Sequence, residues 1–169
     1  LFRSVGERDR VDLWQFASQV GHLGDTRGAE DVAGRLTALI DRLEGPGGGT
    51  RIGAALSRAL DESGAHDVLV ITDGKSYDLD VQALARRGRR VHVVLIGEDS
   101  LEANIGHLAV LTAGSIRVAG SADITRVLVA ALDDCRREGG GARYDRSGVE
   151  LVGAGARIDF RLLERENEG

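Results

Sequence analysis

Hydrophobic and polar residues follow two patterns along the chain, one typical of strands and one typical of helices. Val11 to Ala17 alternates residue by residue, which predicts a strand over 10–17 with two different faces. A short edge strand is expected near Val20 to Leu23. The runs 67–72 and 90–96 are apolar on both faces and rich in β-branched residues, which is typical of strands buried in a parallel sheet. A weaker strand is expected over 115–118.

Between these strands the apolar residues recur at helical spacing. This spacing predicts helices over 32–43, 50–64, 78–87, 100–112 and 122–137. Gly45 to Gly49 separates the first two helices, and Thr50 is expected to open the second. The alternation of strands and helices predicts a doubly wound α/β fold, with a mostly parallel sheet and helices on both of its faces.

The pattern changes after a glycine run at 139–141. The tail predicts one or two short β segments, over 149–152 and 157–163, followed by a charged end. We therefore expect one domain over residues 1–138 and a glycine-rich link with a short β tail over 139–169. Either the tail packs against the sheet as an extra strand, or it begins a neighbouring domain.

Composition narrows the class of partner. The 169 residues are 42% hydrophobic, which is enough to form the core of one domain. The net charge is −5, and the 22 basic residues are scattered among 27 acidic ones, which argues against a nucleic-acid-binding surface. No apolar run approaches the roughly 18 residues of a membrane span, so we expect no membrane insertion. Nothing in the sequence indicates a compartment or an oligomeric state.

The cysteine and histidine residues indicate neither a catalytic site nor a zinc site. Cys135 is the only cysteine, which excludes an internal disulfide, and the sequence favours an ordinary thiol on a helix over a nucleophile. The four histidines lie on separate predicted elements without the spacing of zinc ligands. No Gly-x-Ser-x-Gly motif indicates a serine hydrolase. Trp14 is expected to pack in or near the core.

Two polar motifs are expected at the carboxyl edge of the predicted sheet. Gly47-Gly-Gly-Thr50 precedes a helix, and Thr72-Asp73-Gly74 follows a buried strand. Ligands of a doubly wound sheet bind where strand carboxyl ends and helix amino ends converge. Carboxylate and hydroxyl oxygens are hard ligands that suit Mg²⁺ better than zinc. Thr50 and Asp73 are therefore the candidate metal ligands.

Simpler interpretations of these motifs remain open. The glycines of 45–49 can serve only to end one helix and start another, and Asp73-Gly74 can be a plain turn. A nucleotide-phosphate cradle is disfavoured, because the glycines follow a helix and no Gly-Lys-Ser/Thr accompanies them. Asp78 and Asp80 are expected to cap the next helix rather than to bind metal.

Together with the strand end Trp14-Gln-Phe-Ala-Ser18, these motifs resemble a von Willebrand factor A domain. The resemblance extends over about residues 8–137 and includes Gly48-Gly-Thr50 and Val68-Leu-Val-Ile-Thr-Asp-Gly74. It implies a metal-ion-dependent adhesion site for Mg²⁺, Mn²⁺ or Ca²⁺. In that site Thr50 would be the hydroxyl ligand and Asp73 would hold the ion, commonly through a water. An acidic residue of a partner protein would complete the shell.

One part of the family pattern is absent from the chain. The family's Asp-x-Ser-x-Ser loop does not occur, and the central strand before it would precede Leu1, with residues 1–5 resembling the end of the following helix. Asp145-Arg-Ser147 imitates a fragment of that loop, but no buried strand precedes it. The missing strand would lie between 10–17 and 67–72, so we expect a gap there, which a tail strand at 149–152 or 157–163 could fill. The chain is interpreted as a fragment of a longer, bacterial-looking product.

The leading interpretation is a non-enzymatic protein–protein interaction module that binds an acidic group of its partner through a divalent metal. Metal binding by this chain itself is expected to be weak or absent. One alternative is a degenerate, metal-free scaffold in a larger assembly, for example beside an AAA-type ATPase. Another is a Rossmann-like enzyme that uses Asp73, although the expected Gly-x-Gly-x-x-Gly cofactor fingerprint is not visible.

Overall fold

The computed structural model of the chain describes residues 9–43, 51–73, 78–97 and 103–136. Five strands lie in these ranges: β1 (Asp12–Phe16), β2 (Val20–Asp25), β3 (Asp67–Thr72), β4 (Arg90–Ile96) and β5 (Ile116–Ala119). The five helices are α1 (Val32–Ile40), α2 (Ile52–Glu62), α3 (Val81–Ala85), α4 (Ala103–Leu111) and α5 (Ile124–Arg136). Every predicted strand and helix of these ranges is present. The edge strand β2 is longer than predicted, and α3 is shorter.

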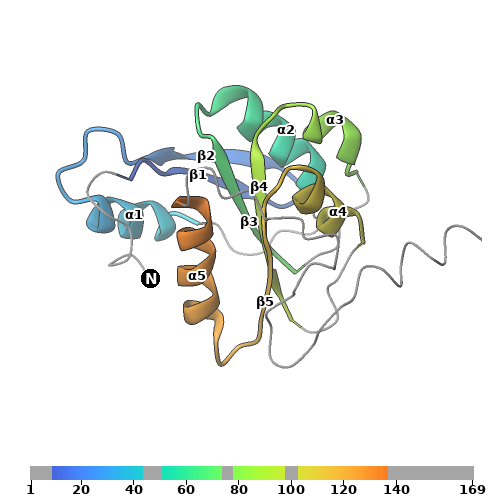
Figure 1. Ribbon diagram of the computed structural model, residues 1–169. Helices are drawn as coiled ribbons and strands as arrows, with labels where there is room; N and C mark the ends of the chain where they lie inside the picture. Colours follow the sequence, from blue (N-terminus) through green and yellow to red (C-terminus); the bar gives the residue numbers. More distant parts are fainter. Residues whose placement is uncertain (1–8, 44–50, 74–77, 98–102, 137–169) are drawn as a thin grey trace, which may run out of the picture.

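The strands form two sheets (Figure 1). The first is the antiparallel pair β1–β2, and the second is the parallel sheet β3-β4-β5, in which Val70 pairs with Val93 and Val93 with Ile116. The predicted α/β fold with a mostly parallel sheet is confirmed. β1 and β3 belong to separate sheets, and the division between them falls where the absent strand is expected.

The parallel sheet is covered on both faces. Helices α2, α3 and α4 pack on one face, and α5 packs on the other (Figure 1). Strand β4 is central and almost wholly buried, because its side chains alternate between the two layers: Val93 and Leu95 face α2, α3 and α4, whereas Val94 faces α5. Each such aliphatic side chain contributes about 1.5–3 kcal/mol on full burial. This double cover explains why the sequence of β4 is apolar without alternation.

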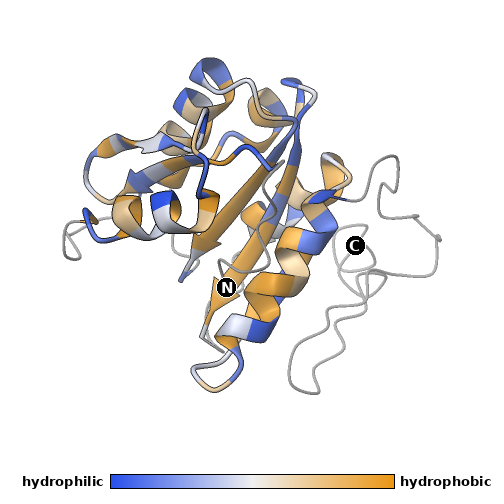
Figure 2. Cartoon of the chain, turned by 90° about the vertical axis from the view of Figure 1, so that its left-hand side faces the viewer, coloured by the Kyte–Doolittle hydropathy of each residue, from blue (hydrophilic) through white to orange (hydrophobic). Residues whose placement is uncertain are grey.

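Hydropathy follows the same arrangement. In Figure 2 the strands of the parallel sheet are coloured apolar over most of their length, and α5 turns an apolar stripe toward them. Helix α1 buries Val32, Leu36 and Leu39 and contacts β2. No helix in the described ranges is both long enough and apolar enough to cross a membrane.

Helix α2 connects the two sheets. Its apolar face, with Ile52 and Leu56, lies in the core of the parallel sheet, where Phe16 of β1 also packs. On its other side, Arg58 Nη1 donates a hydrogen bond of 3.2 Å to the carbonyl of Val20, and the guanidinium lies 5.6 Å from the ring centroid of Trp14. Trp14 is half-buried beside Arg58 and His22, and its expected packing in or near the core stays a prediction.

Several sequence predictions fall outside the described residues. These are the helix end at 1–5, the loop fragment Asp145–Ser147, and the tail with its β segments over 149–152 and 157–163. The boundary between residues 138 and 139 lies there as well. All of them remain predictions.

Candidate functional site

The carboxyl end of β1 meets the amino end of α2. The backbone N–H of Arg51 donates a hydrogen bond of 3.2 Å to the carbonyl of Ala17, which directly follows β1. Arg51 is the cap residue of α2, but its side chain makes no capping hydrogen bond. The first turn of an α-helix has N–H groups without partners inside the helix, so an acceptor from elsewhere in the chain is needed.

Asp78 supplies that acceptor. Its carboxylate Oδ1 accepts from the N–H of Gly53 at 3.0 Å, and Oδ2 accepts from the N–H of Ala54 at 3.2 Å. The prediction that Asp78 caps the following helix is therefore wrong: it caps α2, which precedes it in the chain by 25 residues at Gly53. The same prediction is confirmed for Asp80, which accepts from the N–H of Ala83 and caps α3. With Asp78 engaged at α2, the next helix begins only at Val81.

The candidate ligand Asp73 lies where the sequence predicted. It directly follows β3 and is exposed, whereas the preceding Thr72 is buried, with 7% of its surface exposed. Thr50, the other candidate ligand, lies outside the described residues, one position before Arg51. The structure therefore places Asp73 at the carboxyl edge of the parallel sheet, and the contact between Asp73 and Thr50 stays a prediction.

The donor set suits a hard cation only in part. An exposed carboxylate at a sheet edge is a suitable oxygen ligand for Mg²⁺, which takes six oxygens and keeps several waters. In the described residues, no group of three or more His, Cys, Asp or Glu side chains lies close enough to hold a metal ion. Asp73 can thus supply one oxygen of a coordination shell, and Thr50 stays a predicted second ligand. The remaining ligands would come from water, from a partner or from other parts of the protein.

The amino end of α2 is poorly suited to phosphate. A helix amino terminus binds anions through its free N–H groups, but those of Gly53 and Ala54 already donate to the carboxylate of Asp78. A phosphate would have to displace this carboxylate or bind beside its negative charge. This geometry agrees with the sequence argument against a nucleotide site at Gly45 to Gly49.

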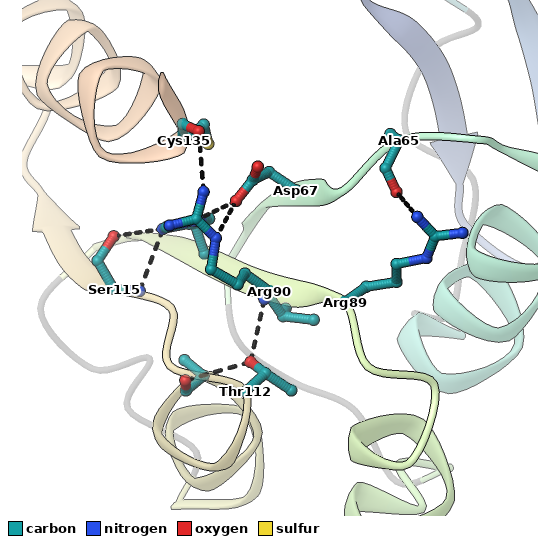
Figure 3. A network of polar contacts seen from close by, with 10 residues as sticks. Ala65, Asp67, Arg89, Arg90, Thr112, Ser115 and Cys135 are labelled. Atoms are coloured by element: carbon teal, nitrogen blue, oxygen red, sulfur yellow. Dashed lines mark hydrogen bonds and ion pairs between the residues drawn. The ribbon is translucent and has the colours of Figure 1, made fainter. Parts of the chain in front are cut away.

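A second polar cluster lies at the opposite edge of the sheet, where the strands begin (Figure 3). Asp67 Oδ1 is 3.1 Å from Nε2 of His92 and 2.7 Å from Nε of Arg90. On the other side of the imidazole, Nδ1 lies 2.9 Å from the hydroxyl of Ser115. Sequence reasoning missed this cluster because His92 lies 25 residues after Asp67 and 23 residues before Ser115, and the three meet only through the register of the parallel strands.

The protonation of His92 follows from its contacts. The backbone N–H of Ser115 donates to Nδ1 at 3.2 Å, so Nδ1 is the acceptor and Nε2 carries the proton that is donated to Asp67. Burial lowers the pKa of His92 below its ordinary value of 6.5, against the opposing effect of Asp67. The imidazole is therefore neutral near pH 7.

Serine, histidine and aspartate are also the residue types of a hydrolytic triad. Here, however, His92 is only 2% exposed, and its acceptor nitrogen is occupied by a backbone N–H as well as by the hydroxyl. A nucleophile needs a substrate within reach and a base that is free to take its proton. We therefore assign the cluster a structural role, which is to hold the beginnings of β3, β4 and β5 together.

Cys135 lies on α5, as expected for a thiol carried by a helix. Burial, together with the nearby carboxylates of Asp67 and Asp134, raises the pKa of its thiol to about 12. Only the thiolate is a strong nucleophile. Cys135 is thus unreactive at neutral pH.

Comparison with known proteins gives a family and a fold. Residues 1–130 match the von Willebrand factor type A domain. Among solved structures, the conserved hypothetical protein BatB from Bacteroides thetaiotaomicron has a TM-score of 0.60 at 15% identity, covering 79% of this chain and 82% of that one. Proximal thread matrix protein 1 from the mussel byssus has a TM-score of 0.62 at 20% identity, covering 77% of this chain and 37% of its own.

A von Willebrand factor type A protein from Catenulispora acidiphila has a TM-score of 0.59 at 17% identity, covering 79% of this chain and 34% of its own. The present chain thus spans about a third of the length of the latter two proteins. Curated protein sequences yield no match. At these identities the three structural likenesses establish the fold alone.

Proposed function

Because the chain belongs to the von Willebrand factor type A family, we propose that it helps bind an acidic residue of a partner protein through a divalent metal held by Thr50 and Asp73. Domains of this family are generally non-enzymatic protein-interaction modules, and they commonly bind a divalent metal. The metal and the two ligands are the specific part of the proposal.

One observation supports the proposal most strongly. Asp73, which directly follows β3, is exposed. Helix α2 begins two residues after Thr50, and its amino end is bonded both to the residue after β1 and to Asp78, which lies beyond β3. Segments from both sheets therefore converge at the edge where ligands of doubly wound folds bind. When bound, the ion would supply an electrostatic bridge between these oxygens and a carboxylate of the partner.

The affinity of this chain for metal should be low. Two protein ligands leave most of the coordination shell to water, and Mg²⁺ gives up its hydration shell reluctantly. We expect no tight binding of Mg²⁺ or Mn²⁺ by titration calorimetry. A micromolar dissociation constant would contradict this expectation, because it would require further ligands from the chain.

Weak binding can be located by NMR. Mn²⁺ titrated into the ¹⁵N-labelled chain should broaden the amide signals nearest to Thr50 and Asp73 first, because paramagnetic broadening falls steeply with distance. Thr50→Val and Asp73→Asn should each remove the effect, whereas Asp80→Asn, a carboxylate used as a helix cap, should leave it. Added acetate, as a probe of an acidic partner group, should shift the Mn²⁺ midpoint lower. Broadening that is uniform over the chain, or unchanged in both ligand variants, would refute the site.

The second candidate is a metal-free scaffold of the same family. It is favoured because the described part of the chain holds no group of three or more His, Cys, Asp or Glu side chains that could bind a metal ion. The encoded sequence ahead of Leu1 separates the two candidates. An apolar strand followed by Asp-x-Ser-x-Ser would support the metal site, and a strand without those ligands would support the scaffold. The enzyme alternative rests on Asp73 alone.

A further inference from the structure

The second edge of β2 is the outer edge of the β1–β2 hairpin. Among the described residues, β2 pairs with β1 alone. An unpaired strand edge presents backbone N–H and C=O groups that can pair with a strand of another molecule. β2 also contains two glycines, Gly21 and Gly24, and glycine-rich strands specify their pairing register weakly. The outer edge of β2 is therefore a surface at which two copies of the chain could pair.

Three backbone carbonyls of β2 accept hydrogen bonds from arginine side chains. Helix α1 supplies the first arginine, the segment directly after α1 supplies the second, and α2 supplies the third. We call these three residues the edge arginines, and all of them are exposed. Their bonds run from Arg35 Nε to Asp25 (3.3 Å), from Arg42 Nη1 to Leu23 (3.3 Å) and from Arg58 Nη1 to Val20 (3.2 Å).

The pairing of the hairpin explains why these carbonyls are available. In an antiparallel pair, every second residue directs its N–H and C=O away from the partner strand. Asp25 is such a residue, because its neighbour Thr26 is the one that donates its N–H toward β1, to the carbonyl of Val11. Leu23 has no partner in β1, since the pairing register shifts at this point. The edge arginines therefore occupy acceptors that an added strand would need.

We propose that the edge arginines prevent β2 from pairing with β2 of a second copy of the chain. Two identical edges would pair antiparallel about a two-fold axis, so each copy would have to release its own guanidinium groups from the carbonyls. Guanidinium groups stay charged in proteins, and like charges on two approaching edges repel each other. Arg58 is held on the edge by Glu62, 2.7 Å from its Nε, and by the ring of Trp14. The irregular pairing at Leu23 also disfavours strand addition.

Sedimentation equilibrium of the full chain tests the proposal. A variant in which all three edge arginines are replaced by alanine should dimerise with a dissociation constant at least about 10-fold lower than that of the unmodified chain. The matched control replaces three exposed arginines that make no bond to β2, and it should associate no more than the unmodified chain does. It removes the same positive charge, so it separates the edge contacts from net charge. The control substitutions are Arg27→Ala, Arg86→Ala and Arg126→Ala.

Hydrogen exchange measured by NMR locates the contact between the copies. In the dimer, the amide protons of Val20 and Asp25 should exchange more slowly, because their outward N–H groups would pair with the second copy. Circular dichroism establishes that the variants are folded. If the triple variant is not folded, each single edge variant is compared with the single control variants and should associate more strongly than they do.

Three results would overturn the proposal. The first is that no edge variant, triple or single, associates more strongly than the unmodified chain. The second is that the control variants associate as strongly as the edge variants, because net charge would then be the cause. The third is that slower exchange on association is confined to residues outside β2, because the copies would then meet at another surface.

Discussion

Acidification should destabilise the protein through His92 before the carboxylates titrate. In the folded state Nδ1 of this imidazole accepts a hydrogen bond of 3.2 Å from the backbone N–H of Ser115. A proton added to Nδ1 would make it a donor, so this hydrogen bond would be lost and the two N–H groups would repel each other. Burial reinforces the effect and lowers the pKa of His92 in the folded state below 6.5. The groups around the ring are Asp67 on β3, Arg90 on its own strand, Ser115 before β5, and Asp134 on α5.

The sign follows from the direction of this shift. A histidine whose pKa is lowered by folding binds more protons in the unfolded chain, so stability rises with pH between the folded and unfolded pKa values. Its contribution is fully present above about pH 6.5 and is lost as the pH falls toward the folded pKa. For each additional proton bound by the unfolded state, the free energy of unfolding changes by about 1.4 kcal/mol per pH unit. At one unit below 6.5 the loss from His92 is therefore at most about 1.4 kcal/mol.

Urea unfolding followed by circular dichroism at about pH 7.5 and about pH 5.5 measures this loss. The change in the free energy of unfolding with pH should correspond to the uptake of about one proton or less on unfolding. His92→Asn is the control, because it removes the titrating group and should flatten the pH dependence over this range while lowering stability at both values. If the variant and the unmodified chain lose the same free energy on acidification, His92 is not the group responsible. A gain in stability at the lower pH would refute the assigned hydrogen-bond directions.

Two further predictions concern packing and reactivity. Gly114→Ala should lower the free energy of unfolding by about 3 kcal/mol or more, which is the upper end of overpacking costs. The reason is that a Cβ atom at this position would overlap the carbonyl of Val91 in the central strand. A loss below about 1 kcal/mol, measured by urea unfolding, would contradict this geometry. Cys135 should react with iodoacetamide at about pH 8 at least about 100-fold more slowly in the native protein than in urea, since its pKa rises from 9.0 to about 12 and the thiolate fraction falls by about 1000-fold. Equal rates would show that the thiol is accessible and ionised.

The sequence predicted the elements well where one face or both faces of a segment are buried. The unbroken apolar character of 67–72 and 90–96 predicts two buried parallel strands, and their parallel pairing is confirmed. Strand 90–96 is buried as predicted, whereas in 67–72 only Val70 and Thr72 are buried and Ile71 is 44% exposed. Asp73 was placed at the carboxyl edge because it follows such a strand directly. These inferences depend on local periodicity and on the geometry of doubly wound sheets, both of which are visible in one sequence.

Long-range polar contacts were not visible in this way. Because capping is usually local, the sequence predicts that Asp78 caps the helix that follows it, whereas its partners Gly53 and Ala54 belong to an earlier helix. A signal was available, since Arg51 is a poor cap and Gly53 is an unexplained glycine inside a helix. The pairing of Asp67 with His92 likewise depends on strand register, which a single sequence leaves undetermined.

The division into two sheets has a consequence for folding cooperativity. A two-stranded hairpin is only marginally stable by itself in water. β1 and β2 are therefore stabilised by the helices that pack on them, through contacts that include Phe16, Arg51 and Arg58. Among the residues that the structure describes, no backbone ladder joins β1 to β3, and the hairpin is linked to the parallel sheet there by side-chain packing and by the hydrogen bonds of α2. Side-chain packing permits small sliding movements that a strand ladder resists. The amino end of α2 therefore lies between the β1–β2 hairpin and the parallel sheet. A ligand bound there would restrict the movement of the hairpin relative to the parallel sheet.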